Sequence, residues 1–399
     1  MNDQLRGPIL IGFAEALAAP ETAFSLRAAG LPVAAFTRRG KRPPLRKHPE
    51  VPVHAVTAPE QSAAEAISEL KALATTLGAV ALLPLDDPAV WLCDRVAAEL
   101  GLPVIGATGP QARLALDKRL QFDAARAAGL PVPETVVLDQ ASDALNLDEF
   151  PLVLKPAFAV TEIDGRLDKA GGAVCANRDE LVATVQRWRA AGPILAQPWI
   201  AGSGEGVFGI AVDGEVRSWS AHRRLRMVNP QGSGSSACIS AVPEEAITAS
   251  GARMMVQAGW EGLFMLEILR DKHGTPWFME LNGRTWGSLA LARRLGFEYP
   301  AWAASERLGL GHPQGPEPVA RPEVVSRHLG REILHTLSVL RGPKSTALVE
   351  WPGRWETLRS VTRLRRGEGW YNWSREHPAI FLDDTLQTVR GAMPRGRSR

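Results

Sequence analysis

The stretch "WFMELNGRTWGSLALA", residues 277–292, places polar side chains on alternate positions of an otherwise apolar segment. Successive side chains of a strand point to opposite faces, so Glu280, Asn282 and Arg284 share one face if this run is extended. Polar groups gathered beside apolar neighbours are costly unless something pairs with them. The stretch therefore predicts a strand whose polar face needs a partner.

A second strand-like run precedes this one and predicts a hairpin. Within residues 262–284, "GLFMLEILR" and "PWFMELNGR" flank the short segment "DKHGT". A turn at His273 and Gly274 would make the two runs antiparallel neighbours. If the pairing is centred on that turn, Glu267 lies opposite Glu280. Like charges placed directly opposite destabilise a sheet, so a compensating cation is expected there.

The hairpin offers oxygen ligands for a divalent ion. Glu267, Glu280 and Asn282 form an all-oxygen set suited to Mg²⁺, with Mn²⁺ as the alternative ion. Arg284, the next residue on that face, is placed to meet a phosphate or carboxylate oxygen with its planar guanidinium. The alternative is a sheet edge whose polar residues are simply solvated. A register slip of one residue would move Glu280 to the other face.

Composition describes an ordinary globular chain. The 399 residues suggest two or three domains, and 45% hydrophobic with 22% charged residues is typical of a soluble protein. A net charge of +3 argues weakly for a nucleic-acid partner. The three cysteines, Cys93, Cys175 and Cys238, show neither metal-ligand nor disulfide spacing, and no run approaches the roughly twenty apolar residues of a membrane span. We expect a cytoplasmic protein without membrane or nucleic-acid contacts.

The pattern of strands and helices changes along the chain. From residue 8 to about 110, strand-like runs alternate with amphipathic segments, which predicts a doubly wound parallel sheet. This region lacks the Gly-x-Gly-x-x-Gly spacing of a dinucleotide site. The central region predicts antiparallel sheet plus helices, with a hairpin turn at Asp213 and Gly214. Later residues predict helices at 301–309, 324–341 and 354–365, and the basic end "MPRGRSR" is expected to be disordered.

In its motifs the sequence resembles the ATP-grasp superfamily, particularly the carboxylate-amine ligases related to the carbamoyl-phosphate synthase large subunit. The resemblance covers about residues 105–300 and rests on Glu267 with "ELNGR", on "LDKRL" (116–120), on "LVLKP" (152–156) and on "QPWIAGSGEGVFG" (197–209). It implies an α/β and α+β architecture in which a doubly wound domain is followed by an ATP-grasp module of two α+β subdomains. The corresponding ranges are 1–110 for the first domain, 111–195 and 196–305 for the subdomains, the second carrying the metal site, and 306–399 for a C-terminal extension.

The resemblance also implies roles for individual residues. Lys118 and Lys155 match the lysines that hold nucleotide phosphates, and Lys155 also lies near the adenine in such enzymes. Glu205 occupies a position where a ribose-binding acid sometimes appears, although it equally fits an exposed loop. Gly171 and Gly172 come late for the glycine-rich loop that covers the phosphates. The other matches are the adenine-edge segment Gln197, Pro198, Trp199 and Ile200, the metal ligands Glu267, Glu280 and Asn282, and Arg284 aimed at the transferred phosphate or the substrate acid.

A basic strand supplies the candidate substrate side. In "SAHRRLRMVNPQGSGSSACIS", residues 220–240, alternation puts His222, Arg224 and Arg226 on one face and Arg223 on the other. A cationic row beside a metal-phosphate centre could bind a substrate carboxylate. The resemblance supports this role for Arg224, whereas a solvated basic strand explains Arg223 and Arg226 equally well.

These residues and the resemblance together predict an ATP-dependent carbon-nitrogen ligase that uses ATP and Mg²⁺. A small carboxylic acid would become an acyl phosphate, and an amine, an amino acid or peptide among the options, would displace phosphate to form an amide or peptide-like bond. Arg284, Arg224 and Lys155 are the candidate catalytic residues, and a homodimer is the prior expectation for the assembly. The alternatives are a non-catalytic ATP-binding regulatory or scaffold protein of the same fold, and a nucleic-acid-binding protein that rests on the basic clusters alone.

Overall fold

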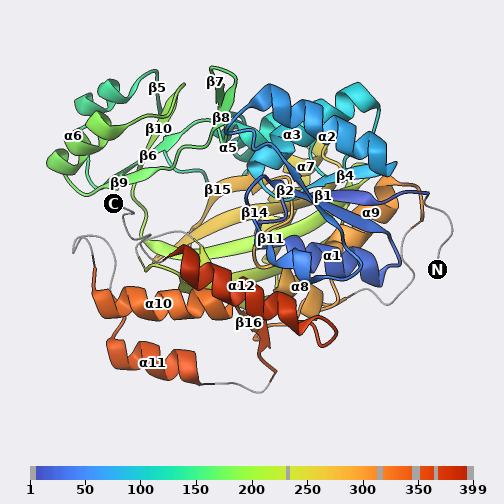
Figure 1. Cartoon of the computed structure of the whole chain (residues 1–399). Helices are drawn as coiled ribbons and strands as arrows, with labels where there is room; N and C mark the ends of the chain where they lie inside the picture. Colours follow the sequence, from blue (N-terminus) through green and yellow to red (C-terminus); the bar gives the residue numbers. More distant parts are fainter. Residues whose placement is uncertain (1–5, 231–233, 312–317, 344–350, 364–366, 393–399) are drawn as a thin grey trace, which may run out of the picture.

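The computed structural model describes residues 6–230, 234–311, 318–343, 351–363 and 367–392. This part of the chain contains three sheets of four or more strands and a separate two-stranded hairpin. In Figure 1 a small lobe around α6 (Arg178–Arg187) lies apart at the upper left, and the last helices lie below the largest sheet. The expected disordered end, 393–399, lies outside the described residues.

The N-terminal domain contains a parallel sheet in the order β3-β2-β1-β4. Its strands are β1 (Ile9–Gly12), β2 (Val33–Arg38), β3 (Val53–Val56) and β4 (Ala81–Pro84). Ile9 and Ile11 pack in one apolar cluster and Leu10 in another, so both faces of β1 are buried. This confirms the predicted doubly wound domain. The connecting elements are α1 (Ala19–Ala28), η1 (Pro44–Lys47), α2 (Ala63–Leu77) and α3 (Asp87–Leu100).

The small lobe is an antiparallel sheet in the order β5-β10-β6-β9 with its own apolar cluster. Its strands are β5 (Val136–Leu138), β6 (Leu152–Pro156), β9 (Ala173–Cys175) and β10 (Ile194–Pro198), with η2 (Ala141–Asn146) and α6 beside them. The hairpin of β7 (Thr161–Ile163) and β8 (Arg166–Asp168) is inserted between β6 and β9. β10 crosses the predicted boundary at residue 195 and belongs wholly to this sheet.

The largest sheet has seven strands in the order β15-β14-β11-β12-β13-β16-β17. Its central strands are β11 (Gly202–Val212), β12 (Glu215–Met227), β13 (Ser235–Ala241), β14 (Gly262–Asp271) and β15 (Pro276–Asn282). Asp213 and Gly214 connect β11 to β12 with φ values of 52° and 76°, as the predicted hairpin turn requires. One face of the sheet packs on α7 (Glu245–Gln257), α4 (Pro110–Leu116) and α5 (Lys118–Ala127) through a shared apolar cluster.

The C-terminal residues continue this sheet rather than forming an appendage. β16 (Val325–Arg327) pairs with β13, and β17 (Gly369–Trp370) pairs with β16. The helix predicted for 324–341 is therefore wrong at its start, where three residues form the strand β16. The helices are α8 (Leu289–Arg294), α9 (Tyr299–Arg307), α10 (Leu329–Arg341), α11 (Arg354–Thr362) and α12 (Pro378–Gly391). No helix in the described ranges is long and apolar enough to cross a membrane.

Candidate active site

The two hairpin carboxylates lie opposite each other, as predicted. Glu267 of β14 pairs with Glu280 of β15. The route to that register differs from the prediction, because Ile268 pairs with Phe278 and the register shifts between the two pairs. Met279 is therefore a bulge residue, and it brings Glu280 into register with Glu267. The pairing is not centred on the turn throughout, yet the opposition is confirmed.

The electrostatics of this pair call for a cation. Burial raises the pKa of Glu280; Lys118 opposes this shift, while Asp87 and Glu267 add to it. The neutralising contact is weak, since Lys118 Nζ lies 3.5 Å from Glu280 Oε1. An ion held by Glu267, Glu280 and the buried Asn282 would remove this repulsion.

The set of oxygen donors fits Mg²⁺ rather than a metal that needs many protein ligands. Within the described ranges, no group of three or more His, Cys, Asp or Glu residues could hold a metal ion. Two carboxylates and one amide oxygen leave coordination positions for water and phosphate, as Mg²⁺ prefers. Glu267, Glu280 and Asn282 are therefore the residues that would hold it.

Two lysines lie beside the hairpin and suit an anionic ligand. Lys155 in β6 donates from Nζ to Gln197 Oε1 at 2.9 Å, and Gln197 Nε2 donates to Thr135 Oγ1 at 2.8 Å. Burial lowers the pKa of Lys155; Glu280 opposes this shift and Lys118 adds to it. Among the described residues, no carboxylate lies within ion-pair distance of Lys155. A half-buried ammonium with only an amide partner fits a site that receives phosphate.

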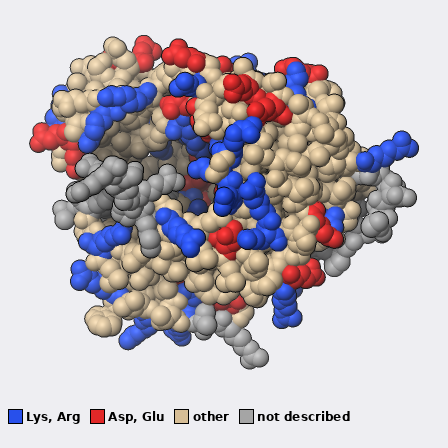
Figure 2. Space-filling model, viewed as in Figure 1, with Lys and Arg blue, Asp and Glu red and all other residues tan. Residues whose placement is uncertain are grey.

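The predicted adenine-edge segment connects the two sheets that flank the site. Gln197 and Pro198 end β10, and Trp199 and Ile200 lead into β11. The Trp199 amide donates to the Pro151 carbonyl at 2.9 Å, which fixes the segment to the small lobe. Figure 2 shows a hollow on this face of the molecule, with Lys and Arg side chains gathered beside it.

Gly172, which comes late in the sequence for a loop that covers the phosphates, lies beside Lys155 in the structure. Ala173 pairs with Leu154, so Gly172 follows the β7–β8 hairpin back to Lys155. A Cβ at Gly172 would lie 2.9 Å from the Leu154 carbonyl oxygen and 3.3 Å from Lys155 Cγ. The close backbone approach beside the lysine requires a glycine there. Sequence distance concealed this loop because the hairpin lengthens the segment.

Arg284 is held by an aspartate that sequence analysis missed. Its Nε donates to Asp87 Oδ1 at 2.6 Å, and Lys169 Nζ lies 2.8 Å from Asp87 Oδ2. Burial opposes the ionisation of Asp87, yet Arg284 and Lys169 outweigh it and hold its pKa below the ordinary value. Asp87 begins α3 directly after β4, at the carboxyl edge of a parallel sheet where ligands commonly bind. This position at the sheet edge is the sequence signal that could have identified Asp87 as a site residue.

Up to Arg224, successive residues of the basic strand β12 lie on opposite faces of the sheet, as the sequence predicts. Arg224 Nη2 lies 2.7 Å from Glu267 Oε1, and His222 Nδ1 lies 2.9 Å from Ser288 Oγ. Burial, with the nearby Arg224, lowers the pKa of His222 to about 3. The register shifts after Arg224, and Arg226 binds Glu332 of α10 instead of the site. Arg223 is exposed and paired in register with Glu205.

Glu205 does not join the site, which corrects the expected ribose-binding role. Gly206 is the β11 residue opposite Glu267, so Glu205, one residue earlier, points to the other face of the sheet. There it accepts from Arg270 at 2.9 and 3.0 Å. The exposed-loop alternative is also wrong, because Glu205 is buried within β11.

Two curated proteins are similar to parts of the chain. A D-alanine–D-alanine ligase from Stutzerimonas stutzeri is 28% identical over 204 residues, which cover 46% of this chain and 59% of the ligase. A carbamoyl phosphate synthase large chain from Rubrobacter xylanophilus is 34% identical over 127 residues, which cover 31% of this chain and 11% of that protein. The chain thus spans less than two thirds of either relative. No family model matches it.

Solved structures share the fold over most of the chain. An L-amino acid ligase from Bacillus licheniformis superposes with a TM-score of 0.61 at 19% identity, covering 80% of this chain and 79% of that one. The ADP complex of N5-carboxyaminoimidazole ribonucleotide synthetase superposes with a TM-score of 0.63 at 15% identity, covering 89% and 96%. At 15–19% identity these likenesses show that the chain has the ATP-grasp fold.

Proposed function

We propose that this chain, which has the ATP-grasp fold, is an ATP-dependent carboxylate-amine ligase. A carboxylate oxygen attacks the γ-phosphorus of ATP, the bond to the bridging oxygen breaks, and an acyl phosphate and ADP form. The nitrogen of an amine then attacks the acyl carbon, the bond to the phosphate oxygen breaks, and phosphate leaves as the amine loses a proton. The product is an amide or peptide-like bond.

The single observation that carries the proposal is the opposition of Glu267 and Glu280 between groups of cations. Lys118 lies 3.5 Å from Glu280, Lys155 is close enough to both carboxylates for their charges to act on it, and Arg224 contacts Glu267 from β12. Phosphoryl transfer needs positioning and charge neutralisation more than a covalent nucleophile. An arrangement of acidic and basic groups that only partly neutralise one another meets that need.

Each residue has a task that its contacts support. Lys155, oriented by Gln197, would hold nucleotide phosphate, and Lys118 would neutralise phosphate charge beside Glu280. Arg284 would stabilise the transferred phosphoryl group once a ligand competes with Asp87 for its guanidinium. Bound Mg²⁺ would supply charge neutralisation between the carboxylates and the phosphates. Gly172 would let backbone approach the phosphates beside Lys155.

The decisive experiment measures release of inorganic phosphate from ATP in a screen of amino acids and small carboxylic acids. We expect at least one acid to stimulate release, and Glu280→Gln to abolish it without unfolding the chain. Glu244→Gln is the matched control, because that carboxylate is half-exposed and binds Arg270 on the opposite face of the sheet. Undiminished turnover by Glu280→Gln would exclude the proposed site. Binding of Mg-ATP without phosphate release for any acid would favour a non-catalytic protein.

A further inference from the structure

An arginine from the C-terminal residues lies beside the candidate substrate strand. Arg331 is in the first turn of α10, and its Nη1 donates to the Ser235 carbonyl at 3.1 Å. Arg224 of β12 pairs in register with Cys238 of β13, and Cys238 pairs on its other side with Ser326 of β16. Burial lowers the pKa of Arg331, and Arg224 is close enough to add to this effect. The two guanidinium groups are therefore close enough to repel each other, and Arg224 itself contacts Glu267.

The charge of Arg331 is not neutralised by the acidic groups around it. The Asp384 carboxylate acts on Arg331, but Asp384 Oδ2 accepts from Asn372 Nδ2 at 2.9 Å and lies 2.9 Å from His328 Nε2. Within the described residues Arg331 forms no ion pair. Arg331 is half-buried, and a guanidinium that is partly removed from water without a carboxylate is costly, so an anionic ligand would offset the cost.

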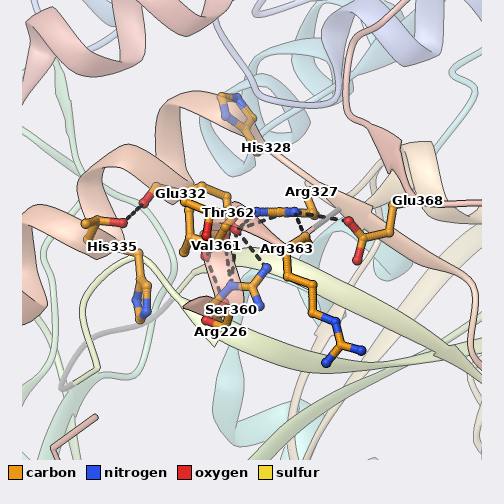
Figure 3. Close-up of polar contacts among 12 residues, drawn as sticks. Arg226, Arg327, His328, Glu332, His335, Ser360, Val361, Thr362, Arg363 and Glu368 are labelled. Carbon is orange, nitrogen blue, oxygen red and sulfur yellow. Dashed lines mark hydrogen bonds and ion pairs between the residues drawn. The ribbon is translucent and has the colours of Figure 1, made fainter. Parts of the chain in front are cut away.

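Glu332, the neighbour of Arg331 in sequence, serves other arginines. Figure 3 shows Arg226 and Arg327 directed toward Glu332, with dashed lines for their contacts. The Arg226 Nη2 and Arg327 Nη2 distances to Glu332 Oε2 are 2.7 and 2.8 Å, and Ser236 Oγ donates to the other oxygen at 2.6 Å. Glu332 is fully buried by this network. The network anchors α10 to β12 and fixes the position from which Arg331 extends.

A second polar group near Arg331 also lacks a strong acceptor. Tyr371 is 1% exposed, and within the described part of the chain its hydroxyl has the Cys238 thiol beside it and no oxygen acceptor within hydrogen-bond distance. Burial and the adjoining Cys238 raise its pKa well above the ordinary value, so the hydroxyl keeps its proton and can donate. Cys238 is a weak acceptor and does not satisfy it. Arg331 and Tyr371 thus keep donor capacity that no carboxylate uses, and each lies close enough to Arg224 for their charges to interact.

Arg224 can contribute to the same ligand when the metal site is filled. Its partner, Glu267, is one of the residues that would hold Mg²⁺, and a carboxylate that binds a divalent ion attracts a neighbouring guanidinium less strongly. The positive charge of Arg224 and Arg331 then exceeds the negative charge near them. This favours an anion on the side of Glu267 away from the phosphates.

We infer that Arg331 and Tyr371 form, with Arg224, a subsite for a substrate carboxylate that is not itself phosphorylated. The inference rests on the proposed ligase function for the identity of the ligand as a substrate. It assigns to the C-terminal residues a part in substrate recognition, and it identifies the second component of the reaction as a molecule that carries its own carboxylate.

The test is a binding experiment that needs no turnover. Each of the twenty standard L-amino acids and its carboxamide is titrated calorimetrically into the full chain with Mg-ADP present. We expect at least one acid to bind more tightly than its amide. Arg331→Met should weaken binding of that acid about 10- to 100-fold, the loss of a charge-assisted hydrogen bond, and leave the amide unaffected. Arg223→Met is the control, because Arg223 is exposed on the other face of β12.

The outcomes separate the subsite from the ligase proposal. If Arg331→Met keeps the wild-type preference for acid over amide, or if the wild-type chain shows no such preference, the subsite is refuted even when acid-dependent phosphate release occurs. If the preference depends on Arg331 but no acid stimulates phosphate release, the subsite stands and the ligase proposal fails. Tyr371→Phe should weaken the same acid about 3- to 10-fold, as loss of a neutral donor to a charged group predicts. Unchanged unfolding temperatures for both variants show that folding is intact.

Discussion

The two opposed glutamates should respond oppositely to loss of their charge. Glu267 forms an ion pair with Arg224, and the side chains are 25% and 15% exposed. Exposed pairs contribute about 0 to 1 kcal/mol, whereas breaking a buried pair costs about 3 to 5 kcal/mol. Glu267→Gln should therefore lower the free energy of unfolding by about 1 to 3 kcal/mol. With an unfolding entropy near 0.8 kcal/mol/K for 399 residues, the unfolding temperature falls by about 1 to 4 °C.

Glu280→Gln should leave the metal-free chain as stable as the wild type or more stable. Burial disfavours its charge most, Asp87 and Glu267 add to this effect, and Lys118 at 3.5 Å and Arg284 only partly offset it. Because the folded pKa is raised above about 4.3, ionisation of Glu280 reduces stability as pH rises through the folded value. The advantage of Glu280→Gln should therefore be present at pH 8 and vanish as the pH approaches 4.

Thermal unfolding of both variants at several pH values, in the presence of a chelator, measures these effects. Added Mg-ADP should stabilise the wild type by about 2.7 kcal/mol at one hundred times its dissociation constant, and neither variant to that extent. Equal destabilisation by the two glutamine substitutions without metal would refute the reasoning. That result would mean that Glu280 is stabilised by its surroundings and that no charge repulsion awaits a metal ion.

Three further predictions concern the residues around this pair. Asp87→Asn should lower the free energy of unfolding at pH 7 by about 2 to 4 kcal/mol. The difference should shrink below pH 4, because a carboxylate with a depressed folded-state pKa stabilises the fold only above the pKa it has in the unfolded chain. Thermal unfolding measured at several pH values checks this. Gly172→Ala should weaken Mg-ADP binding at least about tenfold in calorimetry, whereas Gly171→Ala, whose Cβ would meet no atom within 4 Å, should not. Since the pKa of His222 is about 3, His222→Gln should leave the shape of the kcat/KM profile between pH 5 and 8 unchanged.

Local pattern in the sequence predicted the parts of the site that lie on adjacent strands. Glu267 and Glu280 are separated by one short turn, and period-two alternation with a turn signal was enough to place them opposite each other. The bulge at Met279 could not be predicted, because a bulge depends on how the strand packs against its neighbours. The predicted opposition is nevertheless correct, because the pairs next to the turn are shifted by one residue from the predicted register and the bulge reverses that shift.

Residues brought together over long sequence distances could not be found in that way. Asp87 lies 197 positions before Arg284. Nothing in either local pattern indicates their contact, which depends on how the N-terminal domain packs against the largest sheet. The ribose-binding role expected for Glu205 is wrong for a different reason. Its motif matched the superfamily, but the register of β11 against β14 decides its face, and Gly206 rather than Glu205 lies opposite Glu267.

The C-terminal residues stabilise the candidate site because Glu332 of α10 binds the strand that carries Arg224. Arg226 is two residues beyond Arg224, and its guanidinium binds the fully buried Glu332. Removing Glu332 would leave Arg226 and Arg327 as buried cations, so β12 and α10 hold each other in place. A strand fixed in this way can keep Arg224 at 2.7 Å from Glu267 while a ligand competes for either group. Preorganisation of the proposed substrate side therefore depends on C-terminal residues that lie outside the motifs of the sequence resemblance.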